Sequence, residues 1–217
     1  MKTNQDYKNA ALAALNGNWA PVVVATIVMW VVSFILQLPT GFIDPTASTG
    51  AILAVFYGFM FLAMFITIPV AVGYYNALNK LYLDGDDKVT SNMFTMGFGR
   101  FLRYVGGMLL MGIYIFLWTL LLVVPGIIKA IAYSLVPYIL KDYPELSVNQ
   151  AINLSVKMMK GHKMRYFLLT LSFIGWGLLG ILTLGIGYIW LTPYMYTTTA
   201  AFYQDVKNEY IANGNML

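Results

Sequence analysis

Long apolar stretches constrain the fold of this chain more than any other feature of its sequence. They form four blocks, at residues 19–38, 51–78, 104–140 and 166–203. One helical membrane crossing takes about 20 residues, so the last two blocks are too long for a single crossing. Each has turn-forming residues near its middle, in "VVPGIIK" (123–129) and in "LTLGIG" (182–187). We therefore predict helical hairpins with turns at 125–126 and 184–186, and six membrane-spanning helices in all.

The composition agrees with an integral membrane protein. Hydrophobic residues make up 59% of the 217 residues, and charged residues only 10%. A soluble domain has roughly 25% charged residues, and a chain with so few cannot cover a globular surface with polar groups. Because the chain has no cysteine, cysteine nucleophiles and thiolate metal sites are excluded.

The distribution of positive charge tests the number of spans independently. Of the thirteen Lys and Arg residues, all except Lys129 lie in the two tails or in the connections 79–103 and 141–165. The other three connections contain none. Six spans place all twelve of these residues on one side of the membrane, as the positive-inside rule requires when both termini are cytoplasmic. Four spans would export the most basic connection.

These observations predict an all-α fold, a polytopic helical bundle that forms a single integral membrane domain over residues 1–217. Glycine at position 17 is a suitable stop for a short cytoplasmic helix in residues 1–18. A cytoplasmic loop with an amphipathic helix follows the fourth span, and a cytoplasmic tail ends the chain. The loop is predicted at 141–165 and the tail at 204–217. The six spans are predicted near 19–38, 51–78, 104–124, 126–140, 166–184 and 186–203.

The cytoplasmic loop carries the most basic part of the chain. Ser147 and Gln150 have the spacing of a capping box, and Gly161 is a natural residue to end the helix. The basic residues follow on the polar side of this helix and at the start of the next span: Lys157, Lys160, Lys163 and Arg165. They have two interpretations, a contact with anionic lipid headgroups and plain determinants of topology.

Few polar groups are predicted at membrane depth. No Asp, Glu or His lies within the six spans, and Lys129 is the only ionisable candidate there apart from tyrosines. It is interpreted either as an anion or lipid-headgroup contact or as a lysine that reaches the outer surface. The spans that run inward contain Pro69, Pro137 and Pro193, which predict helix kinks and a vestibule open to the cytoplasm, or simply closer packing.

Several classes of site are excluded. Asp84, Asp86 and Asp87 do not match a calcium-binding loop, because Val89 and Thr95 stand where that loop needs Gly and Glu. The single histidine, at position 162, is predicted to be an interfacial residue. No phosphate-binding, nucleophile-elbow or metalloprotease motif occurs. We therefore expect no enzymatic activity, cofactor, metal site or nucleic-acid partner.

Several segments resemble a bacterial integral membrane family catalogued as domain of unknown function 975. They are "AALNGNW" (13–19), "VVPGIIKAIAYSLVPYIL" (123–140), "AINLSVKMMKGHKMRYFLLTLSFIGWGLLGILTLGIGYIWLTPY" (151–194) and "AFYQDV" (201–206). The resemblance implies a multi-pass protein of the bacterial cytoplasmic (inner) membrane. It implies no substrate, reaction or catalytic residue.

Two functional hypotheses follow. In the preferred one, the chain is a non-enzymatic membrane protein that acts through contacts with lipids, a membrane-protein partner or a second copy at its cytoplasmic face. In the alternative, it is a carrier or channel for a small solute or lipid, with a cavity lined by the proline-containing helices. A polar cavity within the membrane favours the alternative, and a solidly packed bundle favours the first.

Single cysteines test the six-span topology, because the native chain has none. Ser48→Cys is expected to react with an impermeant thiol reagent in intact cells. Asp86→Cys and His162→Cys are expected to react only after the cells are permeabilised. Labelling of His162→Cys in intact cells would contradict six spans.

Overall fold

The computed structural model describes residues 2–36 and 49–214, which form eleven helices and no strand. This confirms the predicted all-α class. In chain order the helices are α1 (Asn4–Leu15), α2 (Trp19–Ile35), α3 (Thr49–Asp84), α4 (Val89–Phe98), α5 (Phe101–Leu121), α6 (Val123–Ala132), α7 (Val136–Asp142), α8 (Val148–Met158), α9 (Lys163–Leu171), α10 (Ile174–Leu182) and α11 (Tyr188–Ala212).

Four helical stretches in the described residues are long and apolar enough to cross a membrane: Thr49–Asp84, Phe101–Leu121, Val123–Asp142 and Lys163–Leu182. The pair α1 and α2, bent by 98°, adds a fifth if it counts as one span. The chain thus has the several apolar helices of a membrane protein. The helix that contains the predicted sixth span, 186–203, is not apolar enough to be counted with these stretches. The six-span count therefore stays a prediction.

The two short helices that capping and stop signals predict, in residues 1–18 and 141–165, are present. Helix α8 begins after Ser147, whose side chain accepts from the Gln150 N–H while the Gln150 side chain accepts from the Ser147 N–H. Gly161 and Gly17 both have positive φ, +87° and +82°, as expected for residues that end a helix. A second capping box, Thr3 with Asp6, starts α1. Local sequence decides these helix ends.

The first hairpin turn lies elsewhere than predicted. The break is at Leu122, which is extended (φ −161°, ψ 140°), and not at 125–126. Pro125 and Gly126 lie inside the first turns of α6, where the missing N–H of proline costs no hydrogen bond. The lack of a side chain at Gly126 also lets the two helices approach, since a Cβ there would lie 2.2 Å from Oγ1 of Thr119.

Other predicted boundaries also change. The span predicted at 126–140 breaks after α6, and a new helix begins just before Pro137, because proline cannot donate to the preceding turn. The span predicted at 166–184 is divided into α9 and α10. Much of the tail predicted at 204–217 is helical, since α11 continues to Ala212. The second hairpin turn lies between α10 and α11, as predicted.

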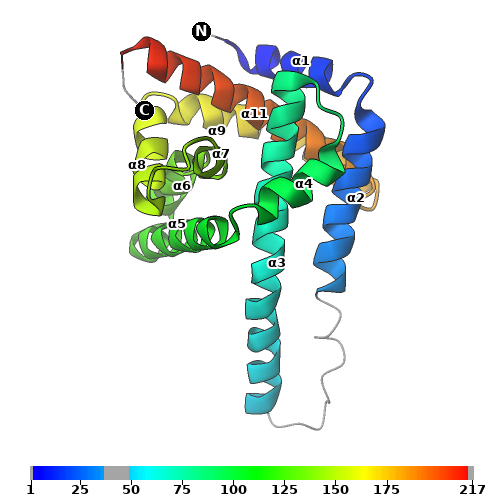
Figure 1. The fold of residues 1–217 in the computed structure, drawn as a ribbon, viewed down its shortest axis with the longest axis vertical. Helices are drawn as coiled ribbons and strands as arrows, with labels where there is room; N and C mark the ends of the chain where they lie inside the picture. The colour runs from blue at the N-terminus through cyan, green and yellow to red at the C-terminus, as the bar shows by residue number, and fades with distance from the viewer. Residues whose placement is uncertain (1, 37–48, 215–217) are drawn as a thin grey trace.

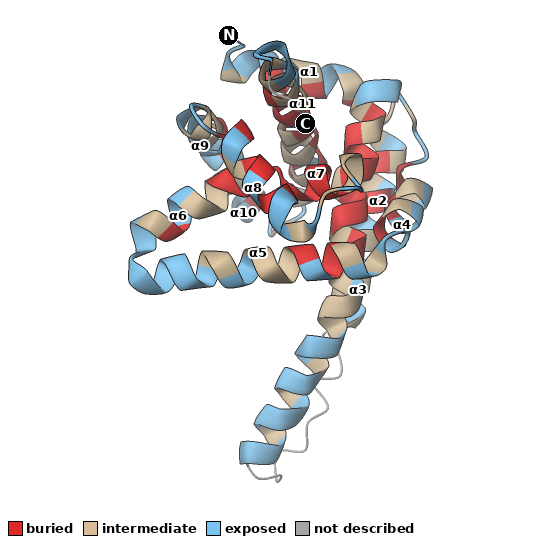
Figure 2. Cartoon of the chain, turned by 60° about the vertical axis from the view of Figure 1, so that its left-hand side comes forward, coloured by how far each residue is buried: buried red, intermediate tan, exposed pale blue. Residues whose placement is uncertain are grey.

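Burial follows a gradient along the apolar helices. In α3 all buried residues lie between Pro69 and Leu81, and none precedes them. In α5 they lie only near its start, and α7 is buried over residues 136–140. Figure 2 shows the buried residues gathered where these ends meet, while the lower half of α3 and the α5–α6 turn are exposed. The helices therefore pack at one end and diverge at the other.

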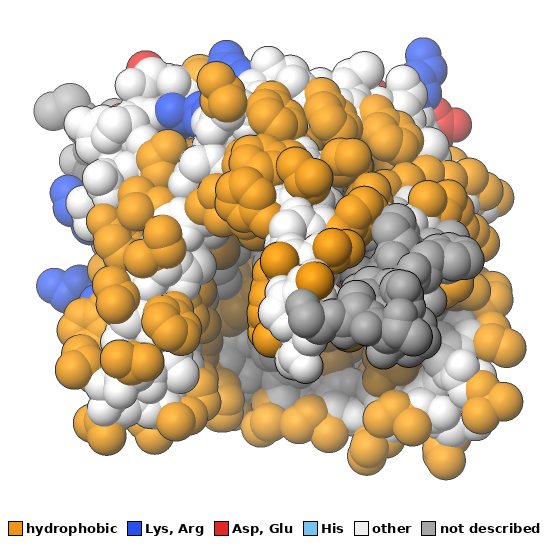
Figure 3. Space-filling view, turned by 90° about the horizontal axis from the view of Figure 1, so that it is seen from below, with side chains coloured by type: hydrophobic (Ala, Val, Ile, Leu, Met, Phe, Trp, Pro, Cys, Tyr) orange, Lys and Arg blue, Asp and Glu red, His pale blue; other side chains and the backbone are white. Residues whose placement is uncertain are grey.

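The diverging ends are apolar. Leu122 is 67% exposed and Leu184, at the tip of the second hairpin, is 94% exposed. Helix α3 projects beyond the other helices, and α5 runs off to one side of it at a steep angle (Figure 1). Seen from below, hydrophobic side chains cover most of the visible face, and the Lys and Arg side chains in view lie at its margin (Figure 3). Such exposed apolar surface is what a lipid environment covers.

Helix α4 packs closely against α3 at the buried end. A Cβ at Gly97 of α4 would lie 2.2 Å from the carbonyl oxygen of Pro69, and one at Gly73 of α3 would lie 1.8 Å from that of Met93. Backbone atoms on both sides leave no flexible group to move aside. Glycine at these two positions is therefore required for the contact between the helices.

We expect Gly97→Ala to destabilise the fold by about 1–3 kcal/mol, because the added methyl group collides with the α3 backbone. Thermal unfolding of the purified protein in detergent measures this. Gly58→Ala is the matched control, since Gly58 is also helical and has nothing near its Cβ position. Equal unfolding temperatures for the two variants would show that the close approach is not needed.

Candidate functional site

Three groups of polar residues lie at the packed end of the helices: a network of ion pairs, a set of exposed lysines, and a tyrosine-lined cavity. The network and the cavity draw residues from helices that are distant in sequence, whereas the lysines lie close together in the chain, between the last turn of α8 and the start of α9. The basic connections 79–103 and 141–165 lie at this end, so the charge rule predicts that this end faces the cytoplasm.

Arg165 is the centre of the ion-pair network. Its guanidinium lies 2.9 Å from Asp205 and 3.5 Å from Glu209, both on α11. It also donates to the hydroxyl of Tyr7 on α1, and that hydroxyl donates to Asp205 over 2.5 Å. The side chains of Arg165 and Asp205 are only 18% and 20% exposed. This residue therefore joins α9 to α11 and α1, and protein carboxylates already neutralise its charge.

Burial raises the pKa of the Asp205 carboxyl, but the hydrogen bonds from Tyr7 and Arg165 lower it by more. The net result is a pKa below the ordinary 3.8. Asp205 is therefore harder to protonate in the folded protein than in the unfolded chain. Its contribution to stability is present above the ordinary pKa and is lost as the pH falls below it.

Two further contacts tie the same region together. Asp142, at the end of α7, accepts from Lys207 over 2.7 Å and from the Tyr203 hydroxyl over 2.8 Å. Arg103, near the start of α5, donates to the backbone carbonyls of Leu140 and Tyr143 over 3.0 and 2.8 Å. These carbonyls lie at the C-terminal end of α7, where a cation is favourable.

The remaining lysines of the basic segment differ from Arg165. Lys157 and Lys160 are exposed, Lys163 is half-buried, and in the part of the chain that the structure describes no ion pair joins any of them to a carboxylate. Lys157 and Lys160 line a hollow of about 390 Å³ together with His162 and Asn213. The structure thus divides the four predicted contact residues into one structural arginine and three lysines whose charge no carboxylate balances.

Two other sequence candidates have partners within the protein. His162 lies 3.6 Å from Glu209 through Nε2, and its Nδ1 is 2.9 Å from Arg165. Lys129 places its ammonium group 4.5 Å from the centre of the Trp118 ring, a cation–π contact across the α5–α6 hairpin. This contact does not test whether Lys129 also binds an anion or a lipid headgroup, which stays a prediction.

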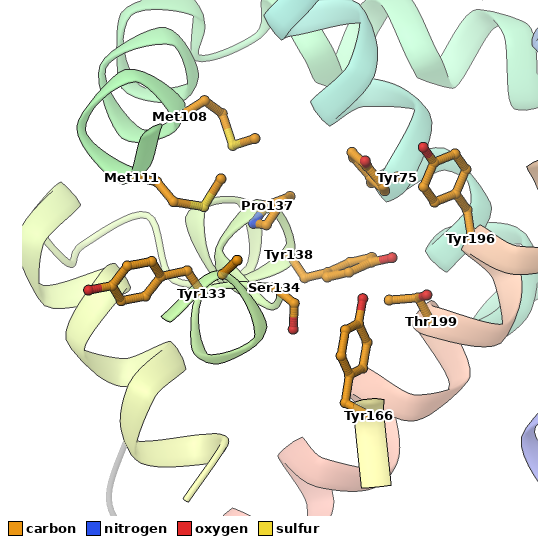
Figure 4. A pocket seen from close by; sticks show the side chains of 11 residues that line it. Tyr75, Met108, Met111, Tyr133, Ser134, Pro137, Tyr138, Tyr166, Tyr196 and Thr199 are labelled. Carbon is orange, nitrogen blue, oxygen red and sulfur yellow. The ribbon is translucent and has the colours of Figure 1, made fainter. Parts of the chain in front are cut away.

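A cavity of about 180 Å³ lies among α3, α5, α6, α7, α9 and α11 (Figure 4). Its lining is rich in tyrosine: Tyr75, Tyr133, Tyr138, Tyr166 and Tyr196. Pro137 also lines it, whereas Pro69 and Pro193 do not. The sequence does not show that these phenols meet. Its one signal for them is the tyrosines that flank Pro137 in "YSLVPYIL" (133–140) and Pro193 in "YIWLTPYMY" (188–196).

Comparison with known proteins gives a family but no activity. Residues 119–210 match the family described as "Protein of unknown function (DUF975)". This confirms the family resemblance over that part of the chain, which runs from the last turn of α5 through α6, α7, α8, α9 and α10 and through most of α11. The segment at 13–19 lies outside the match. Neither the curated proteins nor the solved structures contain a match to this chain.

We expect Asp205→Asn to lower the free energy of unfolding by about 1–2 kcal/mol at pH 7, because the charged partner of Arg165 is lost. The difference from the wild type should shrink as the pH falls from about 5 to about 3, where Asp205 of the unfolded chain becomes protonated. Denaturant unfolding in detergent at several pH values measures it. Asp87→Asn, a change in an exposed loop, is the control. A difference independent of pH would contradict the ion pair.

Proposed function

We propose that this chain, whose residues 119–210 belong to the DUF975 family, is a non-enzymatic protein of the bacterial cytoplasmic membrane. Its six spans leave both termini in the cytoplasm, and its cytoplasmic face binds anionic lipid headgroups. The observation that carries the proposal is the pair of exposed lysines at positions 157 and 160, which have no carboxylate partner in the described residues.

The orientation of the packed end supports this proposal. Nearly all Lys and Arg residues of the chain belong to connections and tails at this end, and the opposite ends of the helices are apolar and exposed. Basic residues remain on the cytoplasmic side during insertion. Lys157 and Lys160 would then lie close to the inner leaflet, whose anionic lipids attract each basic residue by about 1 kcal/mol.

The four basic residues named from the sequence do not contribute equally to the proposed site, because Arg165 is paired and the lysines are not. Arg165 is held by Asp205 and Glu209, so a lipid phosphate would have to displace two carboxylates to reach it. Lys157 and Lys160 need no such exchange. Lys163, at the start of α9, adds positive charge next to them.

A structural explanation competes with lipid binding. Lys157 lies in the last turn of α8, where a cation stabilises the exposed carbonyls of the helix end. Positive charge here also fixes topology. Neither role requires a particular lipid to stay bound, so lipid retention distinguishes the interpretations.

The carrier or channel hypothesis has weaker support. It requires a cavity lined by the proline-containing helices, and α3, α7 and α11 do line the tyrosine cavity, but its volume of about 180 Å³ is that of a small pocket and not of a path through the membrane. The contacts around Arg165, Arg103 and Asp142 also hold the packed end together across four helices. A closed end of this kind favours a binding role over a path through the membrane.

We expect the wild-type protein to retain phosphatidylglycerol when it is released from mixed phosphatidylglycerol–phosphatidylcholine nanodiscs into a native mass spectrometer. Lys157→Gln with Lys160→Gln should reduce that retention roughly 30-fold, since two basic residues contribute about 2 kcal/mol. Lys88→Gln with Arg100→Gln removes the same charge from exposed positions elsewhere and is the matched control.

Arg165 is left unchanged in this experiment, because its loss would also break the ion pairs with α11. Equal retention in the wild type and both double variants would reject the lipid site. An equal loss of retained phosphatidylglycerol in both double variants would show a response to net charge alone, and this would also reject the lipid site.

A further inference from the structure

The tyrosine cavity has an apolar side and a polar side. Met108 and Met111 of α5 lie on one side, while Tyr138, Tyr166 and Thr199 lie on the other (Figure 4). At about 180 Å³ it exceeds the roughly 150 Å³ that suffices to bind benzene in an apolar cavity. A molecule with about one ring or six to eight heavy atoms fits this space.

The Tyr138 hydroxyl is a buried polar group without a partner. The residue is 1% exposed, and its hydroxyl makes no hydrogen bond within the protein. A buried hydroxyl left unpaired costs about 1–3 kcal/mol, so a group that fills the cavity and bonds to it would recover that energy.

The Tyr138 ring is held so that its hydroxyl cannot easily turn to another partner. It stacks on Tyr203 with a centroid distance of 4.8 Å, and Tyr203 is fixed through its hydrogen bond to Asp142. Tyr75 packs against Tyr138 edge-on at 6.1 Å. A hydroxyl fixed in this way binds a ligand with little loss of side-chain entropy.

The lining also indicates the charge of the ligand. It contains no Asp, Glu, Lys, Arg or His, and an ion enclosed there would lack a countercharge. Tyr75 and Tyr196 pack edge to face, with ring centroids 4.6 Å apart. That contact leaves no space for a cation between these two rings. An uncharged ligand is the remaining class.

We propose that this cavity is a binding site for a small uncharged molecule with an apolar body and a hydroxyl or amide group. The polar group bonds to the Tyr138 hydroxyl, and the apolar body lies against the two methionines. The site shares no residue with the hollow that Lys157 and Lys160 line, so this inference does not depend on lipid binding.

Two fluorinated probes test the site in detergent-solubilised protein by ¹⁹F NMR titration: 4-fluorophenol, and fluorobenzene as the same ring without the hydroxyl. We expect saturable binding of 4-fluorophenol to the wild type. Tyr138→Phe should weaken it roughly tenfold, the effect of one hydrogen bond, and should leave fluorobenzene binding unchanged. Ala130→Leu fills the cavity from its lining and should abolish binding of both probes.

Tyr57→Phe makes the same chemical change on the exposed part of α3 and should bind both probes as the wild type does. Because Tyr138→Phe keeps the ring, it tests the site even if Ala130→Leu unfolds. A cavity that holds only water would show no saturable binding, which overturns the proposal. Equal binding by wild type and a folded Ala130→Leu, or an equal loss of both probes in Tyr138→Phe, also overturns it.

Lys157→Gln with Lys160→Gln should bind both probes normally, which keeps this test independent of the lipid site.

Discussion

The contact between Arg165 and Asp205 determines how the two ends of this chain meet. Together with Tyr7 it joins α1, α9 and α11, three helices that are far apart in sequence. A cation and a carboxylate beside an apolar bundle each need a partner, because neither hydrates fully when four-fifths of its side chain is covered. Their pairing brings the C-terminal part of α11 back across the packed end, and α1 lies along it.

The packed end holds polar contacts, whereas the opposite end needs none. Lipid tails are as apolar as the side chains of α3 and the hairpin tips, so no hydrophobic force draws those helices together within the membrane. Close approach occurs instead where small residues or hydrogen bonds allow it, as at Gly73 and Gly97. The divergence of the helices in Figure 2 follows from this difference in driving force.

The two proposed sites share this end and a structural connection. Helix α8, which carries Lys157, is held to α6 by the hydrogen bond from Ser155 to the Ala132 carbonyl over 2.7 Å. Ala132 lies two residues before Ser134 of the cavity. The lysines lie at the surface, whereas tyrosine and methionine side chains from several helices line the cavity. The two proposals therefore concern different ligands, an anionic headgroup at the lysines and a small uncharged molecule in the cavity.

The sequence by itself determined the features that depend on neighbouring residues. The capping box of Ser147 and Gln150, the stop at Gly161 and the presence of both hairpins follow from local backbone and hydrogen-bonding preferences. Proline and glycine form turns, so the sequence predicts the first turn at 125–126. The same two residues also suit the start of a helix. In the structure they lie at the start of α6, where Gly126 packs closely against Thr119.

Only the tertiary structure decided which basic residues are paired. Arg165 and Lys160 look alike in the sequence, and the carboxylates that separate them lie about 40 residues away on α11. The cavity likewise requires tyrosines from α3, α7, α9 and α11 to meet. Periodicity and capping act over one or two helical turns, so they carry no information about contacts that form when distant helices pack.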